Sequence, residues 1–234
     1  MSITQNVDEI RERIAAAARR TGRDPKEVTL MAVSKTFSPE RVREAYVAGL
    51  RVFGENRVQE FSGKAEALAD LKDTEWHMIG HLQTNKAAKA AELFTAVDSV
   101  DSLRLAEKLN GSAQQIGKKL RVLIEINVGG EAAKSGILPQ SPALEEMLLA
   151  APTLEHLELR GLMTIPPFYD DPQQARPYFR KLRELRDRIL ARRLPSLGME
   201  VLSMGMSHDF EVAIEEGSTC VRIGTAIFGE RIKS

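Results

Sequence analysis

The 234-residue chain carries 33 basic and 33 acidic side chains, so its net charge of zero gives no electrostatic reason to expect nucleic acid or a membrane surface as its main partner. Its single cysteine, Cys220, excludes an internal disulfide and a thiolate metal cluster, and no apolar run approaches the roughly 18 residues of a membrane-spanning helix. Length and composition therefore predict one cytoplasmic globular domain over residues 1–234.

Helical and strand-like segments alternate along the chain. The first segment, 7–20, spaces apolar residues between charged ones and predicts a surface helix ahead of the first strand. Further helices are predicted at 39–48, 58–71, 84–92, 102–115, 141–150, 172–191 and 209–216. Short runs of apolar residues, many of them β-branched, predict eight strands at 28–35, 50–56, 75–80, 94–100, 120–128, 156–165, 199–205 and 219–229.

The predicted strands are apolar almost throughout and are separated by single helices. This pattern indicates parallel pairing with both faces covered. An open doubly wound sheet usually stops at about six strands, whereas eight such units in 234 residues match a closed barrel. We therefore predict an α/β fold, a single (β/α)8 TIM barrel with an extra N-terminal helix.

In such a barrel, functional groups gather at the carboxyl ends of the strands and in the loops that follow. The residues at these positions are mostly polar, and they are Lys35, Asn56, His77, His81, Asp98, Asn127, Met163, Thr164, Ser203, Ser207, Arg222 and Gly224. Polar groups beside apolar strands need partners, so they predict a wet pocket that binds a polar ligand.

Lys35 closes the apolar strand at 28–35. A partly desolvated lysine favours the uncharged amine that attacks carbonyl groups, which is the chemistry of a Schiff-base lysine. The alternative is a lysine whose stem covers the core while its charged end stays in water. Lys35 alone does not decide between the two.

Two clusters near the end of the chain, 203–209 and 222–229, are suited to holding an anion. Loops after the seventh and eighth strands of such barrels commonly bind phosphate through backbone N–H groups. We predict phosphate contacts at Ser207, Gly224 and Thr225, with Ser203 as a less certain fourth. Ordinary turn and capping chemistry is the alternative.

A Schiff-base lysine and a phosphate site together predict a phosphorylated aldehyde, and pyridoxal 5′-phosphate (PLP) is a cofactor of that kind. Arg222 beside the pyridine nitrogen would only donate a hydrogen bond, which keeps that nitrogen unprotonated and weakens the ring as an electron sink. Arg222 in a salt bridge is the alternative. A lysine-dependent aldolase acting on a sugar phosphate would use the same two ingredients.

Four segments carry a resemblance to a known family: 32–60, 76–86, 161–167 and 203–231. They begin with AVSKTF, WHMIGH, GLMTIPP and SMGMSHD. Through them, nearly the whole chain resembles the pyridoxal phosphate homeostasis proteins, single-domain PLP-binding barrels similar to the N-terminal domain of alanine racemase. The stretches 108–119 and 140–155 carry no motif.

The resemblance implies PLP bound as a Schiff base on Lys35, with its phosphate near Ser207, Gly224 and Thr225 and its ring nitrogen beside Arg222. It also implies that Asn56 and the 77–81 region line the pocket. The remaining predicted contacts are His81, Met163 and Ser203. No catalysis is established for the family. The implied role is to bind, buffer or deliver PLP inside the cell, with PLP-dependent apo-enzymes as possible recipients.

The alternative function is a PLP-dependent amino-acid racemase of low activity. A racemase needs acid and base groups on both faces of the ring, and in alanine racemases the second is a tyrosine supplied with a further domain and a dimer partner. This sequence ends at Ser234, soon after the last predicted strand, and Tyr169 is the tyrosine expected nearest the mouth. We therefore predict a PLP-binding monomer that is not an enzyme.

Other chemistry-bearing residues receive structural interpretations. His77, His81, His156 and His208 do not show the spacing of a metal site, so no metal is predicted. Cys220 is expected in the core. The charged helix at 172–193 is interpreted as a solvated face with pairs four residues apart, with docking onto acidic PLP-dependent enzymes or RNA as the minor alternative.

Overall fold

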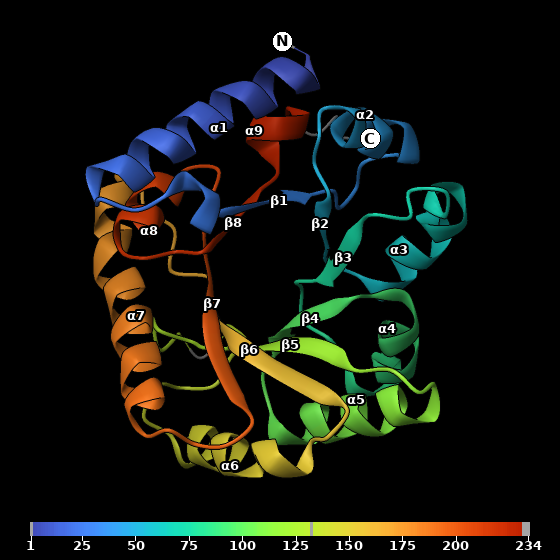
Figure 1. Cartoon of the computed structure of the whole chain (residues 1–234), viewed down its shortest axis with the longest axis vertical. Coiled ribbons are helices and arrows are strands. Elements are labelled where there is room, and N and C mark those ends of the chain that lie inside the picture. Colours follow the sequence, from blue (N-terminus) through green and yellow to red (C-terminus); the bar gives the residue numbers. More distant parts are fainter. Residues whose placement is uncertain (1, 132, 231–234) are drawn as a thin grey trace.

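The computed structural model describes residues 2–131 and 133–230, so Arg231, the last residue of the fourth matching segment, lies outside the described residues. Eight parallel strands form a closed barrel in which each strand pairs with the next and β1 pairs with β8 (Figure 1). The strands are β1 (Thr29–Val33), β2 (Val52–Glu55), β3 (Glu75–Met78), β4 (Ala96–Val100), β5 (Leu120–Glu125), β6 (Leu157–Met163), β7 (Leu197–Met206) and β8 (Cys220–Ile223). The predicted TIM barrel is confirmed.

Helices surround the barrel as a ring (Figure 1). They are α1 (Ile3–Arg20), α2 (Pro39–Val47), α3 (Val58–Ala65), α4 (Ala87–Leu93), α5 (Leu103–Gln115), α6 (Pro142–Ala150), α7 (Arg176–Ala191), α8 (Phe210–Glu215) and α9 (Thr225–Phe228). Short 3-10 turns precede or follow several of them, at Pro25–Glu27, Glu66–Leu68, Thr84–Lys86, Ala151–Thr153 and Pro172–Ala175. Within the described residues, no helix has the length and apolar character needed to cross a membrane.

The extra helix α1 begins at a capping box. The Ser2 hydroxyl accepts a hydrogen bond from the Gln5 N–H, and the Gln5 side chain accepts one from the Ser2 N–H. One face of α1 is buried, and the helix packs against α8 and α9 (Figure 1). The Asn6 amide donates to the Ile227 carbonyl over 2.8 Å, so the beginning of the chain supports the turn that follows β8.

The apolar core has two parts. The larger part lies between the barrel and the surrounding helices, and it explains why the strands carry apolar residues on their outer face. The smaller part fills the inside of the barrel with Met31, Val33, Ile79 and Cys220. Val33 and Ile79 of this smaller part also line the cavity described below, whereas Cys220 lies nearer the opposite end of the barrel.

Several predicted boundaries differ from the observed ones, and the end of the last strand is one of them. The last strand was expected to run to residue 229, but β8 ends at Ile223 and α9 follows. The N–H groups of Ile227 and Phe228 turn back to the Gly224 carbonyl, which replaces strand pairing by a helical turn. A short apolar run does not distinguish a strand from a buried helix by its periodicity alone.

Candidate functional site

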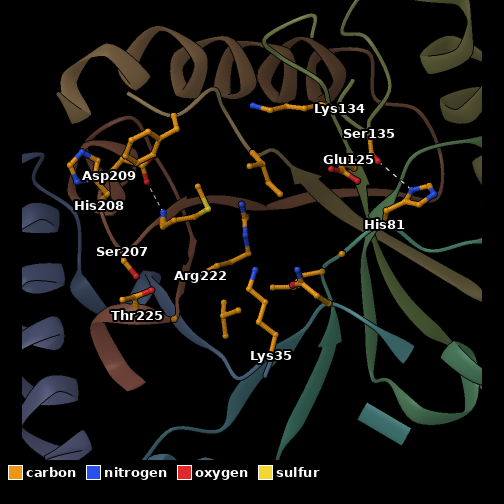
Figure 2. A pocket seen from close by; sticks show the side chains of 18 of the residues that line it. Lys35, His81, Glu125, Lys134, Ser135, Ser207, His208, Asp209, Arg222 and Thr225 are labelled. Atoms are coloured by element: carbon orange, nitrogen blue, oxygen red, sulfur yellow. Dashed lines mark hydrogen bonds between the residues drawn. The ribbon is translucent and has the colours of Figure 1, made fainter. Parts of the chain in front are cut away.

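A cavity of about 480 Å³ opens at the carboxyl ends of the strands (Figure 2). The described residues that line it are Val33, Lys35, Phe37, Asn56, Ile79, Gly80, His81, Glu125, Ile126, Lys134, Ser135, Ile165, Phe168, Met206, Ser207, His208, Asp209, Arg222, Gly224 and Thr225. A volume of several hundred Å³ is typical of small-molecule sites, and because 11 of these 20 residues are polar or charged, the cavity suits a ligand with several polar groups.

Seven of the nine residues predicted to contact the cofactor line this one cavity. They are Lys35, Asn56, His81, Ser207, Arg222, Gly224 and Thr225. Met163 and Ser203 are fully buried behind the cavity wall, on the neighbouring strands β6 and β7. The structure therefore brings together side chains that are up to 190 residues apart in the sequence, because β1 and β8 pair.

Lys35 lies at the turn that follows β1, half-buried, with its side chain directed into the cavity (Figure 2). The next residue, Thr36, has a φ of +66°, a left-handed conformation that a β-branched residue rarely adopts. The Thr36 N–H donates to the Glu60 carboxylate, which holds this conformation. The backbone thus changes direction immediately after Lys35.

A buried ion pair supports the same turn from below. The Lys64 ammonium lies 2.8 Å from the Glu55 carboxylate and donates to the Ser34 carbonyl over 3.0 Å. The Ser34 hydroxyl donates to the same Glu55 oxygen over 2.6 Å. Burial raises the pKa of Glu55, against the opposing effect of Lys64. The sequence interpretation missed this pair, because Lys64 reads as an ordinary charged residue of a surface helix.

The end of the cavity formed by β7 and β8 carries hydroxyl groups and glycine. The Ser207 hydroxyl accepts a hydrogen bond of 3.4 Å from the Ala226 N–H at the start of α9, and Thr225 is exposed beside it (Figure 2). A Cβ built on Gly224 would meet the Val33 carbonyl oxygen at 3.4 Å, an ordinary contact. Packing alone therefore does not require glycine at this position.

Asn56 is placed by a close approach of two backbone segments. A Cβ on Gly80 would lie 2.4 Å from the Asn56 carbonyl oxygen, a distance that no side chain can occupy. Glycine at position 80 is therefore required for the loop after β3 to pack against the loop after β2. The sequence interpretation used Gly80 only as the end of a strand.

Arg222 projects from β8 into the middle of the cavity and is only 3% exposed (Figure 2). Its guanidinium donates to the Ser203 hydroxyl over 2.8 Å and to the Thr164 carbonyl over 2.7 Å. Burial lowers the pKa of Arg222, while surrounding groups that include the Asp98 and Asp209 carboxyls oppose this effect. Ser203 therefore holds the arginine in place from behind the cavity wall.

Glu125, at the end of β5, lines the cavity and was missed by the sequence interpretation. It is 7% exposed, and its Oε2 atom is buried without a hydrogen-bond partner among the described residues. Burial and the nearby Asp101 carboxylate raise the pKa of Glu125 to about 7, although Arg222 and His81 oppose this shift. The rule that selected strand ends would have found Glu125 if the predicted strand had ended at its true boundary instead of at residue 128.

His81 lies at the mouth of the cavity. Its Nδ1 atom is 3.1 Å from the Asp101 carboxylate and 3.3 Å from the Ser135 hydroxyl (Figure 2). Ser135 and Lys134 belong to the loop after β5, which lies outside the four segments that carry the resemblance. Lys134 pairs with Glu131 at 2.6 Å and donates to the Pro166 carbonyl.

His77 does not line this cavity, although the resemblance placed the 77–81 region in the pocket. Its ring lies lower in the barrel, where Nδ1 is 3.0 Å from Asp98, near Cys220. Burial disfavours the charged ring, but the Asp98 carboxylate, which is hydrogen-bonded to Nδ1, and the Glu75 carboxylate, 3.6 Å from Nε2, raise the pKa of His77 to about 9. The ring is therefore part of an ion pair inside the barrel.

The remaining predicted groups have structural surroundings. Cys220 is free and buried, and burial raises the pKa of its thiol to about 12. In the described part of the chain, no three His, Cys, Asp or Glu side chains are grouped so as to hold a metal ion. The Tyr169 hydroxyl is 2.7 Å from that of Tyr178, and neither residue lines the cavity.

Comparisons with known proteins give consistent results. Residues 5–232 match the family model described as the N-terminal domain of alanine racemase. A pyridoxal phosphate homeostasis protein of Aquifex aeolicus is 48% identical over 99% of both chains. Its counterpart in Escherichia coli K12 is 44% identical over 98% of this chain and 97% of its own.

The solved structures agree. PipY from Synechococcus elongatus, solved with PLP bound, is 38% identical in sequence and superposes with a TM-score of 0.81. The match covers 94% of this chain and 100% of PipY. An alanine racemase of Clostridium difficile shares the fold at 16% identity and a TM-score of 0.70, with 58% of the racemase covered. The chain belongs to the family of pyridoxal phosphate homeostasis proteins, which is built on the alanine racemase N-terminal barrel.

Proposed function

We propose that this chain binds PLP in the cavity at the carboxyl ends of the strands and serves PLP homeostasis by binding, buffering or delivering the cofactor. The observation that carries the proposal is the meeting of Lys35 with Ser207, Arg222, Gly224 and Thr225 in one cavity. The names of the relatives, and the PLP in the PipY structure, support the same ligand.

The residues present fit this cofactor. Packing does not require a glycine at position 224, and the missing side chain leaves space in the cavity. The adjacent hydroxyls of Ser207 and Thr225 are suited to phosphate oxygens. The cofactor supplies an aldehyde, which condenses with a primary amine. Lys35 supplies the amine for a Schiff base, and the turn held by Glu60 and Lys64 directs it into the cavity.

Arg222 is proposed to face the ring nitrogen of the cofactor. A guanidinium only donates hydrogen bonds, so it favours an unprotonated ring nitrogen and a weak electron sink. The bonds to Ser203 and Thr164 prevent the guanidinium from turning away. Asn56 and His81 line the rest of the proposed site, and Met163 and Ser203 support its wall from behind.

We propose that the chain holds the cofactor without turning over a substrate. A racemase needs a second acid or base opposite the lysine. Among the described lining residues no tyrosine occurs, and Tyr169, the one expected near the mouth, is paired with Tyr178. Together with Arg222, this arrangement favours a carrier over a racemase of low activity.

The setting of this function is also a proposal. All the proposed contacts come from one chain, which is consistent with a single-domain monomer as the working unit. The free, buried Cys220 suits the reducing cytoplasm. PLP-dependent apo-enzymes are the proposed recipients of the cofactor.

The test is to load the purified protein with PLP, record its absorbance in the violet region, reduce it with borohydride and map the modified peptide. We expect violet absorbance and a modified Lys35. Lys35→Ala should remove both while circular dichroism stays unchanged, because Lys35 lies at the rim and outside the packed layers.

Lys134 provides the internal comparison, because it is the other lysine among the described residues that line the cavity. A borohydride adduct found on Lys134 would place the Schiff base in the loop after β5 instead of on Lys35 after β1, which would contradict the proposal. A colourless protein that binds a sugar phosphate would favour the aldolase instead.

A further inference from the structure

The two ends of the cavity carry different polar side chains. The end formed by β7 and β8 offers hydroxyl groups at Ser207 and Thr225, whereas Glu125, His81 and Ser135 lie at the opposite end (Figure 2). The Asp101 carboxylate lies behind His81, at 3.1 Å from its ring. The Asp209 carboxyl also lines the β7 end, but it accepts a hydrogen bond of 2.6 Å from the Met206 N–H, whereas Glu125 and Asp101 bring two carboxyl groups to the opposite end.

Glu125 is the member of this second end that lacks a structural partner. It is 7% exposed, lines the cavity, and its Oε2 atom is buried without a hydrogen bond among the described residues. Buried carboxyl oxygens are normally hydrogen-bonded, so an unpaired one in a side chain that lines a cavity indicates a donor that reaches this carboxyl group when a ligand occupies the cavity. None of the roles proposed for the bound cofactor uses this oxygen.

We propose that Glu125 forms a subsite for the primary ammonium group of an amine that displaces PLP from Lys35. An ammonium offers three hydrogen-bond donors and the charge opposite to that of a carboxylate. Because Asp101 adds a second negative group, the subsite favours an amine without a neighbouring carboxylate, such as a lysine side chain, over a free α-amino acid. This inference rests on the proposed function.

The exchange balances without an oxidant or reductant. The ammonium gives a proton to Glu125, and the amine nitrogen then forms a bond to the carbon held by Lys35. The double bond between that carbon and Lys35 Nζ breaks, and both of its electron pairs go to Nζ. The amine nitrogen meanwhile gives up its two hydrogens and completes a double bond to the same carbon. The two remaining amine hydrogens and the proton held by Glu125 end on Nζ, so the ligand leaves on the new amine and Lys35 is again an ammonium.

The exchange should depend on pH, because only the ionised carboxyl accepts a proton. Burial and Asp101 raise the pKa of Glu125 to about 7. The charged groups that face it or share its cavity are Asp101 after β4, His81 after β3, Arg222 on β8, Lys35 after β1, Lys134 after β5 and Asp209 after β7. We expect release by amines to accelerate as the pH rises through about 7.

The experiment uses protein loaded with PLP and freed of excess ligand. Loss of violet absorbance is followed after adding ethylamine or, separately, glycine, below and above pH 7, and rate constants are taken for the loaded fraction alone. Glu125→Gln should slow release by ethylamine about tenfold and remove the part of its rise with pH that exceeds the rise in free-amine concentration. Release by glycine should change much less, because repulsion between its carboxylate and the Glu125 and Asp101 carboxyl groups keeps its ammonium group out of the subsite.

Glu107→Gln is the matched control, since it makes the same chemical change on the exposed face of α5. It should behave as the wild type. Equal ethylamine rates in the wild type and Glu125→Gln would overturn the proposal. A preference between the two amines that persists unchanged in Glu125→Gln would also contradict it.

A second measurement separates this inference from the proposed function. Failure of the wild type to take up PLP would reject the function itself. The subsite is then tested in ligand-free protein carrying carbon-13 in its glutamate carboxyl groups, titrated with ethylammonium. A shifted signal that is missing in Glu125→Gln supports the subsite, and unshifted carboxyl signals reject it.

Discussion

Two glycines that line the cavity, Gly80 and Gly224, differ in whether the packing of the protein requires a glycine at their position. Gly80 is required by packing, because any side chain there would collide with the Asn56 backbone. Gly224 has no such constraint, since a methyl group would make ordinary contacts with Val33. A residue whose small size the protein itself does not need is more informative about a ligand than one that the fold requires.

Gly224→Ala should therefore leave the free energy of unfolding within about 1 kcal/mol of the wild type and still weaken PLP retention by about tenfold. The reason is that the methyl group fits against Val33 and enters space proposed for the phosphate. Urea denaturation of the ligand-free protein and equilibrium dialysis with PLP measure the two effects. Gly80→Ala is the comparison and should lower stability strongly. Unchanged PLP affinity in Gly224→Ala would move the phosphate elsewhere.

His77 should make stability depend on alkaline pH. Its folded pKa of about 9 lies above the ordinary value of 6.5, so its contribution is complete below pH 6.5 and is lost as the pH rises through 9. The loss is on the order of 3 kcal/mol, because each pKa unit corresponds to about 1.4 kcal/mol. Urea denaturation across this range measures it. His77→Gln should flatten the decline, and the control His156→Gln should not.

At the scale of elements, charged residues connect segments that sequence patterns treat separately. Three arginines of α7, at positions 176, 180 and 183, converge on Glu216, which is 6% exposed in its side chain and follows α8. The sequence indicated pairs within the charged helix, four residues apart. Periodicity shows which face of a helix is polar, but it does not show which neighbouring element supplies the opposite charge.

The Lys64–Glu55 pair is the element-scale feature closest to the site, because it joins α3, β2 and the turn after β1. Lys64→Met should destabilise the fold by about 3 to 5 kcal/mol, since it leaves Glu55 buried and unpaired. Adding Glu55→Gln should restore part of that loss. Thermal unfolding of both variants, with Lys72→Met on the surface as control, measures the effect. A single variant as stable as the wild type would rule out the pair as a support.

At the scale of the whole molecule, the sequence predicts the architecture and most of the side chains that line the cavity, but it misses two buried charged residues in or beside the site. Eight short apolar runs and their spacing were enough for the barrel, because parallel strands buried on both faces leave a strong local pattern. Lys35, Arg222 and Gly224 were found by the strand-end rule. Glu125 was not, because the strand was predicted to end three residues too late. Lys64 was not, because its importance depends on burial, and burial of a charge is decided by distant segments.

Ligand binding should stabilise the molecule as a unit, because the proposed contacts join β1 to the loops after β7 and β8. At about 100 times its dissociation constant, PLP should add about 2.7 kcal/mol to the free energy of unfolding. A higher melting temperature that rises with PLP concentration is the expected result. Lys35→Ala should show a smaller increase, and an equal increase in both proteins would argue against a role for Lys35 in retention.

The pairing of β1 with β8 also has a consequence for biogenesis. Some residues that line the cavity are synthesised early in translation and others near its end. A nascent chain whose β8 has not yet left the ribosome therefore lacks a complete PLP cavity. Contacts between such distant segments form slowly. Newly made chains must consequently close the barrel without help from bound PLP. The ligand then stabilises only molecules that have already folded.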